Sequence, residues 1–326
     1  MRKSSFLIII VFAFVSCSKN NKVEDYTLKG FVFGTTYKIT YLNTSKNYQK
    51  SVDSLFYLMN KSLSTYITTS DISKINNGDT TIVVDDLFLE VFKKSKKIHK
   101  KTNGYFDPTV GNLVNAWGFG PKREKKNLTN SEVQNQMQYV GFDKVTLVNN
   151  KVDKKYPEIY LDFNATAKGF GIDMIARFLE QKNIHNYLVE IGGEIRTKGV
   201  KENNIPWTIL LVDPIDKEGS DGYKKINLSN KSMATSGNYR KFRVSENGQK
   251  FVHTINPKTG LAKESNLLSA SVIAAKDCAD VDAFATAFMA MGLEKTKAFL
   301  EKHKDLQVIL LFTNDAGNLE EFTTYK

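Results

Sequence analysis

The sequence is poor in the residues that mark several protein classes. Its 326 residues include two cysteines and six prolines. Cys17 and Cys278 are too few for a disulfide-stabilised scaffold, and no Cys/His cluster has the spacing of a zinc site. Six prolines also exclude long proline-rich linkers. A chain of this length can bury enough apolar surface for a conventional core, which we expect to stabilise the fold.

Long apolar runs are also missing. Residues 6–15 (FLIIIVFAFV) form an apolar run of ten residues, whereas a membrane-spanning helix needs about 20. The run follows Arg2 and Lys3, a pattern typical of a secretory signal peptide. Cys17 comes just after the run, which is similar to a bacterial lipoprotein signal.

We therefore expect residues 1–16 to be a signal peptide and Cys17 to be acylated, with palmitate as one lipid. Residues 17–25 have the composition of a polar tether. This predicts an exported lipoprotein, anchored to a membrane and facing the periplasm of a bacterium. Two alternatives stay open: a secreted protein cleaved elsewhere, and a short uncleaved anchor.

The charge is strongly positive but identifies no partner. Lysine and arginine total 46 and aspartate and glutamate 35, a formal net charge of +11. The densest basic run, residues 122–126 (KREKK), is short and interrupted by a glutamate. Because the sequence has no basic and aromatic signature of RNA recognition, we interpret the excess as a solvated lysine-rich surface and expect no nucleic-acid partner.

Segments with strand and helix periodicity alternate irregularly along the chain. Strands are expected at residues 38–42, 207–212 and 306–312, the last two of them buried. Helices are expected at residues 51–62, 85–101, 167–181 and 279–291, and residues 298–303 continue the helical pattern. Because regular βαβ alternation is missing, we predict one catalytic domain over residues 26–326. Its class is α+β, with a mixed or antiparallel sheet core and packed helices.

Two glycine-rich segments have the composition of ligand-binding loops. In residues 106–121, two aromatic rings flank a glycine at 117–119, and such a pair could hold a flat ring. The alternative is a tryptophan that fills the core. In residues 161–173, Lys168 lies at the start of a helix, where main-chain amides and a lysine can cradle phosphate. The GxxxxGK[ST] pattern is missing, and an ordinary strand-to-helix turn is the alternative.

Two smaller segments offer main-chain and hydroxyl groups. Residues 190–196 (EIGGEIR) contain paired glycines, which indicate a bulge or a close backbone passage. Residues 233–239 (MATSGNY) offer hydroxyls and amides rather than charge.

His253 precedes the NPKTG turn at residues 256–260 and ends a strand. It is a candidate catalytic residue, although a lone histidine is more often structural. Asp282 and Thr286 are four residues apart and share one helix face, and their hard oxygen atoms suit Mg²⁺. For Asp277 and Asp280 we favour an acidic first turn that interacts with the helix dipole.

Taken in order, these segments resemble the ApbE family, the FAD:protein FMN transferases. The resemblance covers roughly residues 30–292. The matching segments are FGTTYKI (33–39), STY (64–66), FDPTVGNLVNAWGFGP (106–121), LDFNATAKGFGID (161–173), VEIGGEIRTKG (189–199), ATSGNY (234–239), HTINPKTG (253–260) and DVDAFATAFMAMG (280–292).

The resemblance implies an ApbE-like, T-fold-like structure and a Mg²⁺-dependent transfer of FMN from FAD to a threonine hydroxyl of an acceptor protein, with release of AMP. Such acceptors are commonly subunits of membrane redox systems. The family's metal ligands match Asp282, Thr286 and the main-chain carbonyl of Ala165. Its FAD-contacting positions match Phe33, Tyr66, Trp117, Gly118, Phe119, Asp162, Lys168 and His253.

In the enzyme that the resemblance implies, Lys168 neutralises the diphosphate of FAD, and His253 takes the threonine proton or orients the phosphate. Asn164, Ala165 and Thr166 replace a more usual small or hydrophobic triplet. Because the ligand there is a main-chain carbonyl, we expect the metal site to survive. Two other functions stay open: an FAD pyrophosphatase that yields FMN and AMP, and a non-catalytic exported flavin-binding lipoprotein, which the Asp282 and Thr286 pair disfavours.

Overall fold

The computed structural model describes residues 23–121, 127–215, 222–238, 242–244, 250–262 and 265–326. Cys17, the expected signal peptide and the basic run of residues 122–126 lie outside these ranges. Within the described ranges, the first strand begins at Glu24, slightly before the expected end of the tether. None of the helices in the described ranges has the length and apolar character needed to traverse a bilayer.

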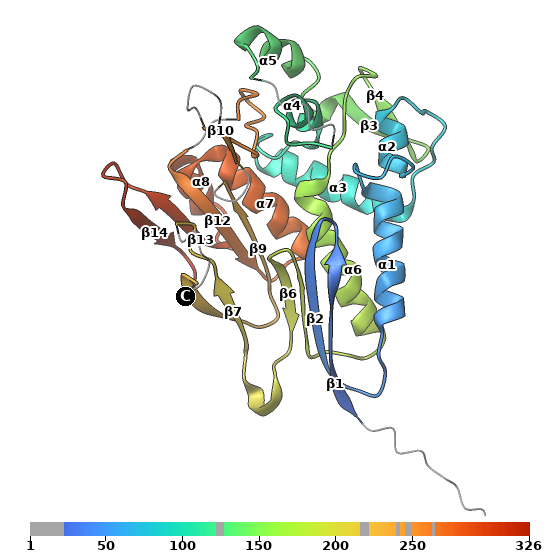
Figure 1. Cartoon of the computed structure of the whole chain (residues 1–326), viewed down its shortest axis with the longest axis vertical. Helices are drawn as coiled ribbons and strands as arrows, with labels where there is room; N and C mark the ends of the chain where they lie inside the picture. The colour runs from blue at the N-terminus through green and yellow to red at the C-terminus, as the bar shows by residue number, and fades with distance from the viewer. Residues whose placement is uncertain (1–22, 122–126, 216–221, 239–241, 245–249, 263–264) are drawn as a thin grey trace, which may run out of the picture.

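The core is an eight-stranded sheet in which every neighbouring pair is antiparallel (Figure 1). Its strands, in spatial order, are β1 (Glu24–Val32), β2 (Thr35–Thr44), β5 (Tyr187–Ile191), β6 (Glu194–Lys198), β9 (Ser232–Gly237), β12 (Leu267–Ala274), β13 (Gln307–Thr313) and β14 (Leu319–Thr323). Three two-stranded sheets add β3 (Val145–Val148) with β4 (Lys151–Lys154), β7 (Trp207–Leu211) with β8 (Lys224–Leu228), and β10 (Phe242–Val244) with β11 (Lys250–Val252).

Helices cover one face of the large sheet, and the β7–β8 hairpin packs on the other (Figure 1). The α-helices are α1 (Gln49–Leu63), α2 (Asp71–Asn76), α3 (Asp86–Lys101), α4 (Gly111–Ala116), α5 (Asn130–Met137), α6 (Asn164–Gln181), α7 (Cys278–Met291) and α8 (Leu293–Glu301). Short 3₁₀ turns are η1 (Pro108–Val110), η2 (Phe142–Lys144) and η3 (Glu202–Asn204). The largest apolar cluster joins Ile39 and Val189 of the sheet to Ile172 of α6 and Phe284 of α7.

The predicted α+β class with an antiparallel sheet is confirmed, and each predicted strand and helix overlaps an observed one. The helix predicted to begin at residue 167 begins three residues earlier, at Asn164. Residues 207–211 do form a strand, but the prediction that this strand is buried is wrong. Alternate residues of β7 are exposed, because it belongs to a two-stranded sheet whose outer face is open to solvent. Leu210, for example, is 53% exposed.

Candidate functional site

Helices α6 and α7 cross closely at the centre of the candidate site. A Cβ atom on Gly169 would lie 2.6 Å from the carbonyl carbon of Cys278, so glycine is needed where α6 meets the start of α7. The N–H of Gly169 donates to Oδ2 of Asp282 at 3.2 Å, and Asp282 is buried. In a regular helix the N–H of residue 169 pairs with the carbonyl of residue 165. Asp282 therefore competes for that donor with Ala165, whose carbonyl is the expected metal ligand.

Thr286 lies one turn beyond Asp282 on the same face of α7. Its Oγ1 is 3.2 Å from Oγ of Ser236, near the end of β9. In the described part of the chain, no three Cys, His, Asp or Glu side chains are grouped as metal ligands. A magnesium site here would therefore combine a single carboxylate with hydroxyl and main-chain oxygen atoms, and Mg²⁺ accepts such sets because it keeps waters and substrate oxygens.

Lys168 pairs with Glu194, a carboxylate to which the sequence assigns no role. Its Nζ lies 2.7 Å from Oε1 of Glu194, the first residue of β6. Although burial opposes the charged form, Glu194 and Asp282 raise the pKa of Lys168. Burial raises the pKa of Asp282 well above its usual range, and the charge of Glu194 adds to this shift. Two buried carboxyl groups thus lie beside one ammonium, and a bound divalent cation would stabilise the charged form of both.

Five buried side-chain polar atoms have no hydrogen-bond partner within the described ranges. They are Ser95 Oγ, Asn115 Oδ1, Thr166 Oγ1, Glu194 Oε2 and Asn238 Oδ1. All except the serine belong to segments that resemble the family motifs. Because buried polar groups are normally paired, atoms of this kind indicate a ligand that completes the site.

The segments before α6 hold its first turn in place. The N–H of Asp162 donates to the carbonyl of Pro108 at 2.8 Å, and Oδ1 of Asp162 accepts the N–H of Asn164 at 2.8 Å. The side chain of Asn164 donates to Oγ1 of Thr65 at 3.1 Å. Asp162 therefore lies at the entrance to α6, where burial raises its pKa. Tyr66 is next to Thr65 in sequence and is 57% exposed.

Phe33 packs against the same part of α6. It lies in the turn between β1 and β2 with a φ of 51°. Its ring would be 2.9 Å from a Cβ atom on Gly171, and its centroid is 5.6 Å from that of Phe56. Since Gly171 is three residues after Lys168, the Phe33 ring lies within about one helical turn of the lysine.

The turn that carries His253 contacts the far half of α7. His253 directly follows β11 and is half-buried. The side-chain amide of Asn256 donates to the carbonyl of Ala290 at 3.2 Å, one turn beyond Thr286. The structure therefore brings the 253–260 segment to the helix that carries Asp282 and Thr286.

Trp117 is buried rather than open to a ligand. Its indole is 3% exposed, its Nε1 donates to the carbonyl of Gly260 at 2.9 Å, and its ring centroid lies 5.0 Å from that of Phe251. This favours the core-filling alternative for the indole. Gly118 and Phe119 are half-buried and stay candidates for contact with the flavin.

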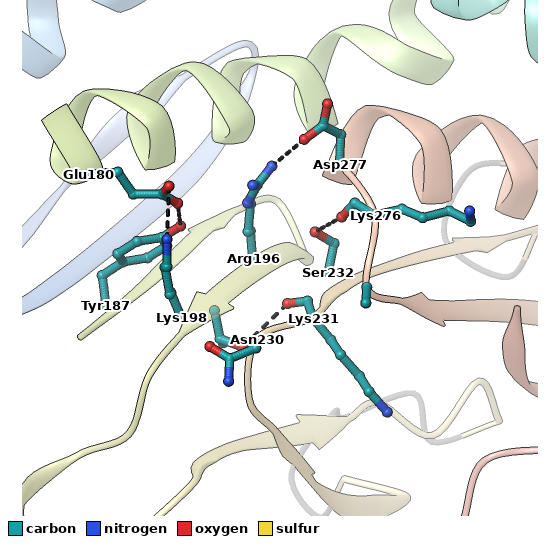
Figure 2. Close-up of a pocket in the computed structure, with 11 residues that line it drawn as sticks. Glu180, Tyr187, Arg196, Lys198, Asn230, Lys231, Ser232, Lys276 and Asp277 are labelled. Atoms are coloured by element: carbon teal, nitrogen blue, oxygen red, sulfur yellow. Dashed lines mark hydrogen bonds and ion pairs between the residues drawn. The ribbon is translucent and has the colours of Figure 1, made fainter. Parts of the chain in front are cut away.

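A separate cavity of about 270 Å³ lies at the opposite ends of β6 and β9 (Figure 2). Its charged lining is paired within the protein: Lys198 lies 2.9 Å from Glu180, and Arg196 lies 2.6 Å from Asp277. None of the buried atoms that lack a partner lines this cavity. The cavity therefore has less evidence for a ligand than the α6–α7 crossing.

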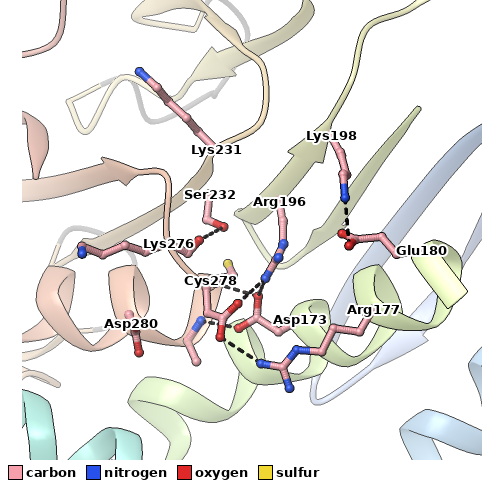
Figure 3. A network of polar contacts seen from close by, with 12 residues as sticks. Asp173, Arg177, Glu180, Arg196, Lys198, Lys231, Ser232, Lys276, Cys278 and Asp280 are labelled. Carbon is pink, nitrogen blue, oxygen red and sulfur yellow. Dashed lines mark hydrogen bonds and ion pairs between the residues drawn. The ribbon is translucent and has the colours of Figure 1, made fainter. Parts of the chain in front are cut away.

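Asp173 connects that cavity to the site through an interhelical cap (Figure 3). This fully buried carboxylate of α6 accepts the N–H groups of Cys278 and Ala279 at 2.7 and 2.9 Å. It also lies 2.5 Å from Nη1 of Arg196, which binds Asp277 as well. Burial and the charge of Asp277 raise the pKa of Asp173 to about 6.

Asp277 and Asp280 lie at the start of α7 as expected, but their side chains form ion pairs with lysine and arginine side chains. Asp277 occupies the N-cap position without making a side-chain cap bond. Although burial opposes its charged form, Lys94, Arg196 and Arg177 lower the pKa of Asp277. Lys94 lies 2.7 Å from Asp277 and 3.2 Å from Asp280, and Arg177 lies 2.8 Å from Asp277. The carboxylate that caps α7 is therefore that of Asp173.

Glu194, Asp173 and Ser236 are members of this arrangement that sequence reasoning missed. Each acts on a residue in a distant segment, so no local spacing reveals it. Two of them have a local signal: Glu194 follows the paired glycines, which indicate a close backbone passage, and Ser236 belongs to the hydroxyl-rich segment 233–239.

Comparisons with known proteins identify the family of this chain. A family model described as the ApbE family matches residues 33–310. The FAD:protein FMN transferase of Haemophilus influenzae is 36% identical over 95% of this chain and 92% of its own length. The protein of the same name from Vibrio cholerae is 34% identical over 90% of this chain and 89% of its own length.

Solved structures show the same similarity. The flavin transferase ApbE from Vibrio cholerae has a TM-score of 0.81 and 32% identity, covering 93% of this chain and 97% of that chain. The apo form of the Pseudomonas stutzeri flavinyl transferase ApbE has a TM-score of 0.82 and 26% identity, covering 93% of this chain and 95% of that chain.

Proposed function

This chain belongs to the ApbE family, and from that premise we propose that it transfers FMN from FAD to an acceptor protein. Its curated relatives are named for this activity. The observation that carries the proposal is the meeting of Lys168, Glu194 and Asp282 where α6, β6 and α7 come together. A partly exposed lysine beside two buried carboxyl groups is suited to a phosphate group bound together with a cation.

The proposed cation is Mg²⁺, held by Asp282, Thr286 and the carbonyl of Ala165. The two buried carboxyl groups beside Lys168 and the buried oxygen atoms without partners in the described ranges fit such a cation. When bound, Mg²⁺ would neutralise diphosphate charge and polarise the phosphorus–oxygen bonds.

The protein's own residues account for binding and proton transfer. Lys168 and the first turn of α6 bind the diphosphate, and Phe33, Tyr66, Gly118 and Phe119 are proposed to contact the flavin or adenine. In the transfer, the threonine oxygen of the acceptor forms a bond to the FMN phosphorus. The bridging phosphorus–oxygen bond breaks, and AMP leaves. His253 either takes the hydroxyl proton or orients the phosphate.

The acceptor is proposed to be a redox-protein subunit with a target threonine. The purified chain is incubated with FAD, Mg²⁺ and candidate acceptors, and flavin fluorescence is read in a denaturing gel. A labelled acceptor band that disappears with EDTA is the expected result. Absence of a labelled band with every acceptor would contradict transfer, and release of FMN and AMP without acceptor would instead indicate an FAD pyrophosphatase. Tight retention of FAD without release of AMP would indicate a flavin-binding lipoprotein.

Export and a lipid anchor at Cys17 are part of the same proposal. The support is the apolar run followed by a cysteine in the sequence. In cells fed a labelled palmitate analogue, the chain should incorporate label and fractionate with membranes. Cys17→Ser should lose both properties, and label retained by that variant would rule out Cys17 as the acylation site.

A further inference from the structure

Glu194 is placed by a rigid turn between β5 and β6. Gly192 and Gly193 form the turn, with φ angles of 62° and 99°. The N–H of Gly192 donates to the carbonyl of Thr36 in β2 at 3.0 Å, and a Cβ atom on Gly192 would lie 2.7 Å from Cγ2 of Thr35. Since glycine alone tolerates both the positive φ and this close approach, the turn is held against β2. Glu194 begins β6 at a fixed place and is only 3% exposed.

The two carboxylate oxygens of Glu194 differ in their contacts. Oε1 lies 2.7 Å from Nζ of Lys168. Oε2 is buried and has no hydrogen-bond partner within the described ranges. The fully buried Asp173, by contrast, accepts two main-chain N–H groups and an arginine. A buried carboxylate oxygen without a partner costs free energy, so the Glu194–Lys168 pair is not a saturated structural ion pair.

Lys168 needs such a partner to hold its position. A lysine side chain has many rotamers, and fixing it costs conformational entropy. Lys168 is about one-third exposed, whereas Glu194 is almost fully enclosed. The carboxylate is therefore the rigid member of the pair and the ammonium the movable one.

We propose that Glu194 is a positioning residue for FAD: it fixes the ammonium of Lys168 at the start of α6, where the diphosphate binds. This inference rests on the proposed function, because it assigns Lys168 to the diphosphate. Glu194 acts through Lys168 and does not itself touch phosphate, since two anions would repel each other.

A double-mutant cycle on FAD affinity tests this assignment. Dissociation constants for FAD are measured in EDTA, without acceptor, for the wild type, Glu194→Gln, Lys168→Met and the double variant. We expect each single variant to bind FAD about tenfold more weakly, and the double variant to equal Lys168→Met within about twofold. Wild-type affinity in Glu194→Gln, or single effects that multiply to about a hundredfold in the double variant, would overturn the proposal.

Glu190 provides the matched control. It lies on the other side of the same paired glycines, and its Oε1 accepts the N–H of Gly193 at 3.0 Å. Glu190→Gln keeps an oxygen that can accept this bond, so its FAD affinity should stay within about twofold of the wild type. A tenfold loss in this variant would show that the turn itself, rather than the Glu194–Lys168 contact, controls affinity.

Thermal unfolding of each variant separates binding from folding. If Glu194→Gln does not fold, Glu194→Asp replaces it, because aspartate keeps the charge but has a shorter reach to Lys168. Glu194→Asp should weaken FAD binding when residue 168 is lysine and should not weaken it further in Lys168→Met. Equal loss in the Lys168→Met background would contradict the proposal. FAD affinity is measured separately from transfer. If the wild type transfers FMN but the effects of the two single substitutions are additive, the positioning role of Glu194 is refuted and the proposed function is not. A wild type that binds no FAD either in EDTA or with Mg²⁺ added refutes the proposed function.

Discussion

Asp173 accepts the N–H of Cys278 at 2.7 Å, so the start of α7 is capped by a side chain from α6 (Figure 3). One turn further on, the N–H of Gly169 in α6 donates to Asp282 in α7. Each helix therefore donates main-chain hydrogen bonds to a carboxylate of the other. These reciprocal bonds fix how Asp282 lies relative to the first turn of α6.

Replacement of Asp173 should destabilise the fold. In Asp173→Asn, the amide nitrogen would face main-chain donors and Arg196 would lose one carboxylate. We expect the free energy of unfolding to fall by about 3 kcal/mol, as when one partner of a buried pair is removed. Urea denaturation measures this change. Asp305→Asn is the control: Asp305 is about half-exposed and pairs with Lys276, so its replacement should change the free energy of unfolding by less than about 1 kcal/mol.

The stability that Asp173 contributes should depend on pH. Its folded pKa is about 6, above the ordinary value of 3.8, so the folded protein binds more protons than the unfolded chain between these values. The contribution of Asp173 to the free energy of unfolding therefore decreases as pH rises from about 4 to 6, by up to about 3 kcal/mol in total.

The difference in unfolding free energy between the wild type and Asp173→Asn, measured from pH 4 to 7, checks this prediction. It should decrease as pH rises to 6 and then level off. The lowered pKa of Asp277 acts below pH 3.8, where its stabilising contribution is lost on acidification, so it does not obscure this window. A difference independent of pH would contradict the assignment.

Asp282→Ala should abolish Mg²⁺-dependent transfer and leave the fold intact. Burial raises the pKa of Asp282 well above its usual range, so its removal takes away a carboxyl group that is costly to ionise, while the rest of α7 stays packed. We expect transfer to fall at least about 100-fold with little change in melting temperature. Asp280→Asn, two residues away on the same helix and paired with Lys94, is the control and should retain transfer. Wild-type transfer by Asp282→Ala would refute the metal assignment.

Gly169→Ala should separate α6 from α7. The added methyl would lie 2.6 Å from main-chain atoms of Cys278, which cannot move without shifting α7. We expect a loss of about 2 kcal/mol in unfolding free energy, despite the better helix propensity of alanine. In Gly171→Ala the methyl meets only side-chain atoms, of Phe33 at 2.9 Å and Met59 at 3.8 Å, which can shift more easily than the main chain, so the loss should be smaller. Chemical denaturation of both variants decides, and equal losses would show that the α6–α7 contact is not the tight one.

The sequence predicts what depends on local spacing. The Asp282 and Thr286 pair follows from helical periodicity, and the antiparallel sheet class follows from strand patterning without βαβ alternation. The Lys168–Glu194 and Asp173–Cys278 contacts join residues 26 and 105 positions apart, and no periodicity connects such positions. Trp117 shows a second limit. A tryptophan on a glycine-rich loop has the same sequence pattern whether its indole meets a ligand or, as here, Phe251.

The order of strands in the sheet has a consequence for the growing polypeptide. β2 pairs with β5, so residues 35–44 gain their second neighbour only after residues 187–191 have been synthesised. The contact between Gly169 and Asp282 forms later still, because Asp282 lies 113 residues after Gly169 in the sequence. A nascent chain that ends before α7 has the lysine but lacks Asp282. Under the proposed function, a chain must therefore complete α7 before it can bind nucleotide and cation together, which would keep incomplete chains from trapping FAD.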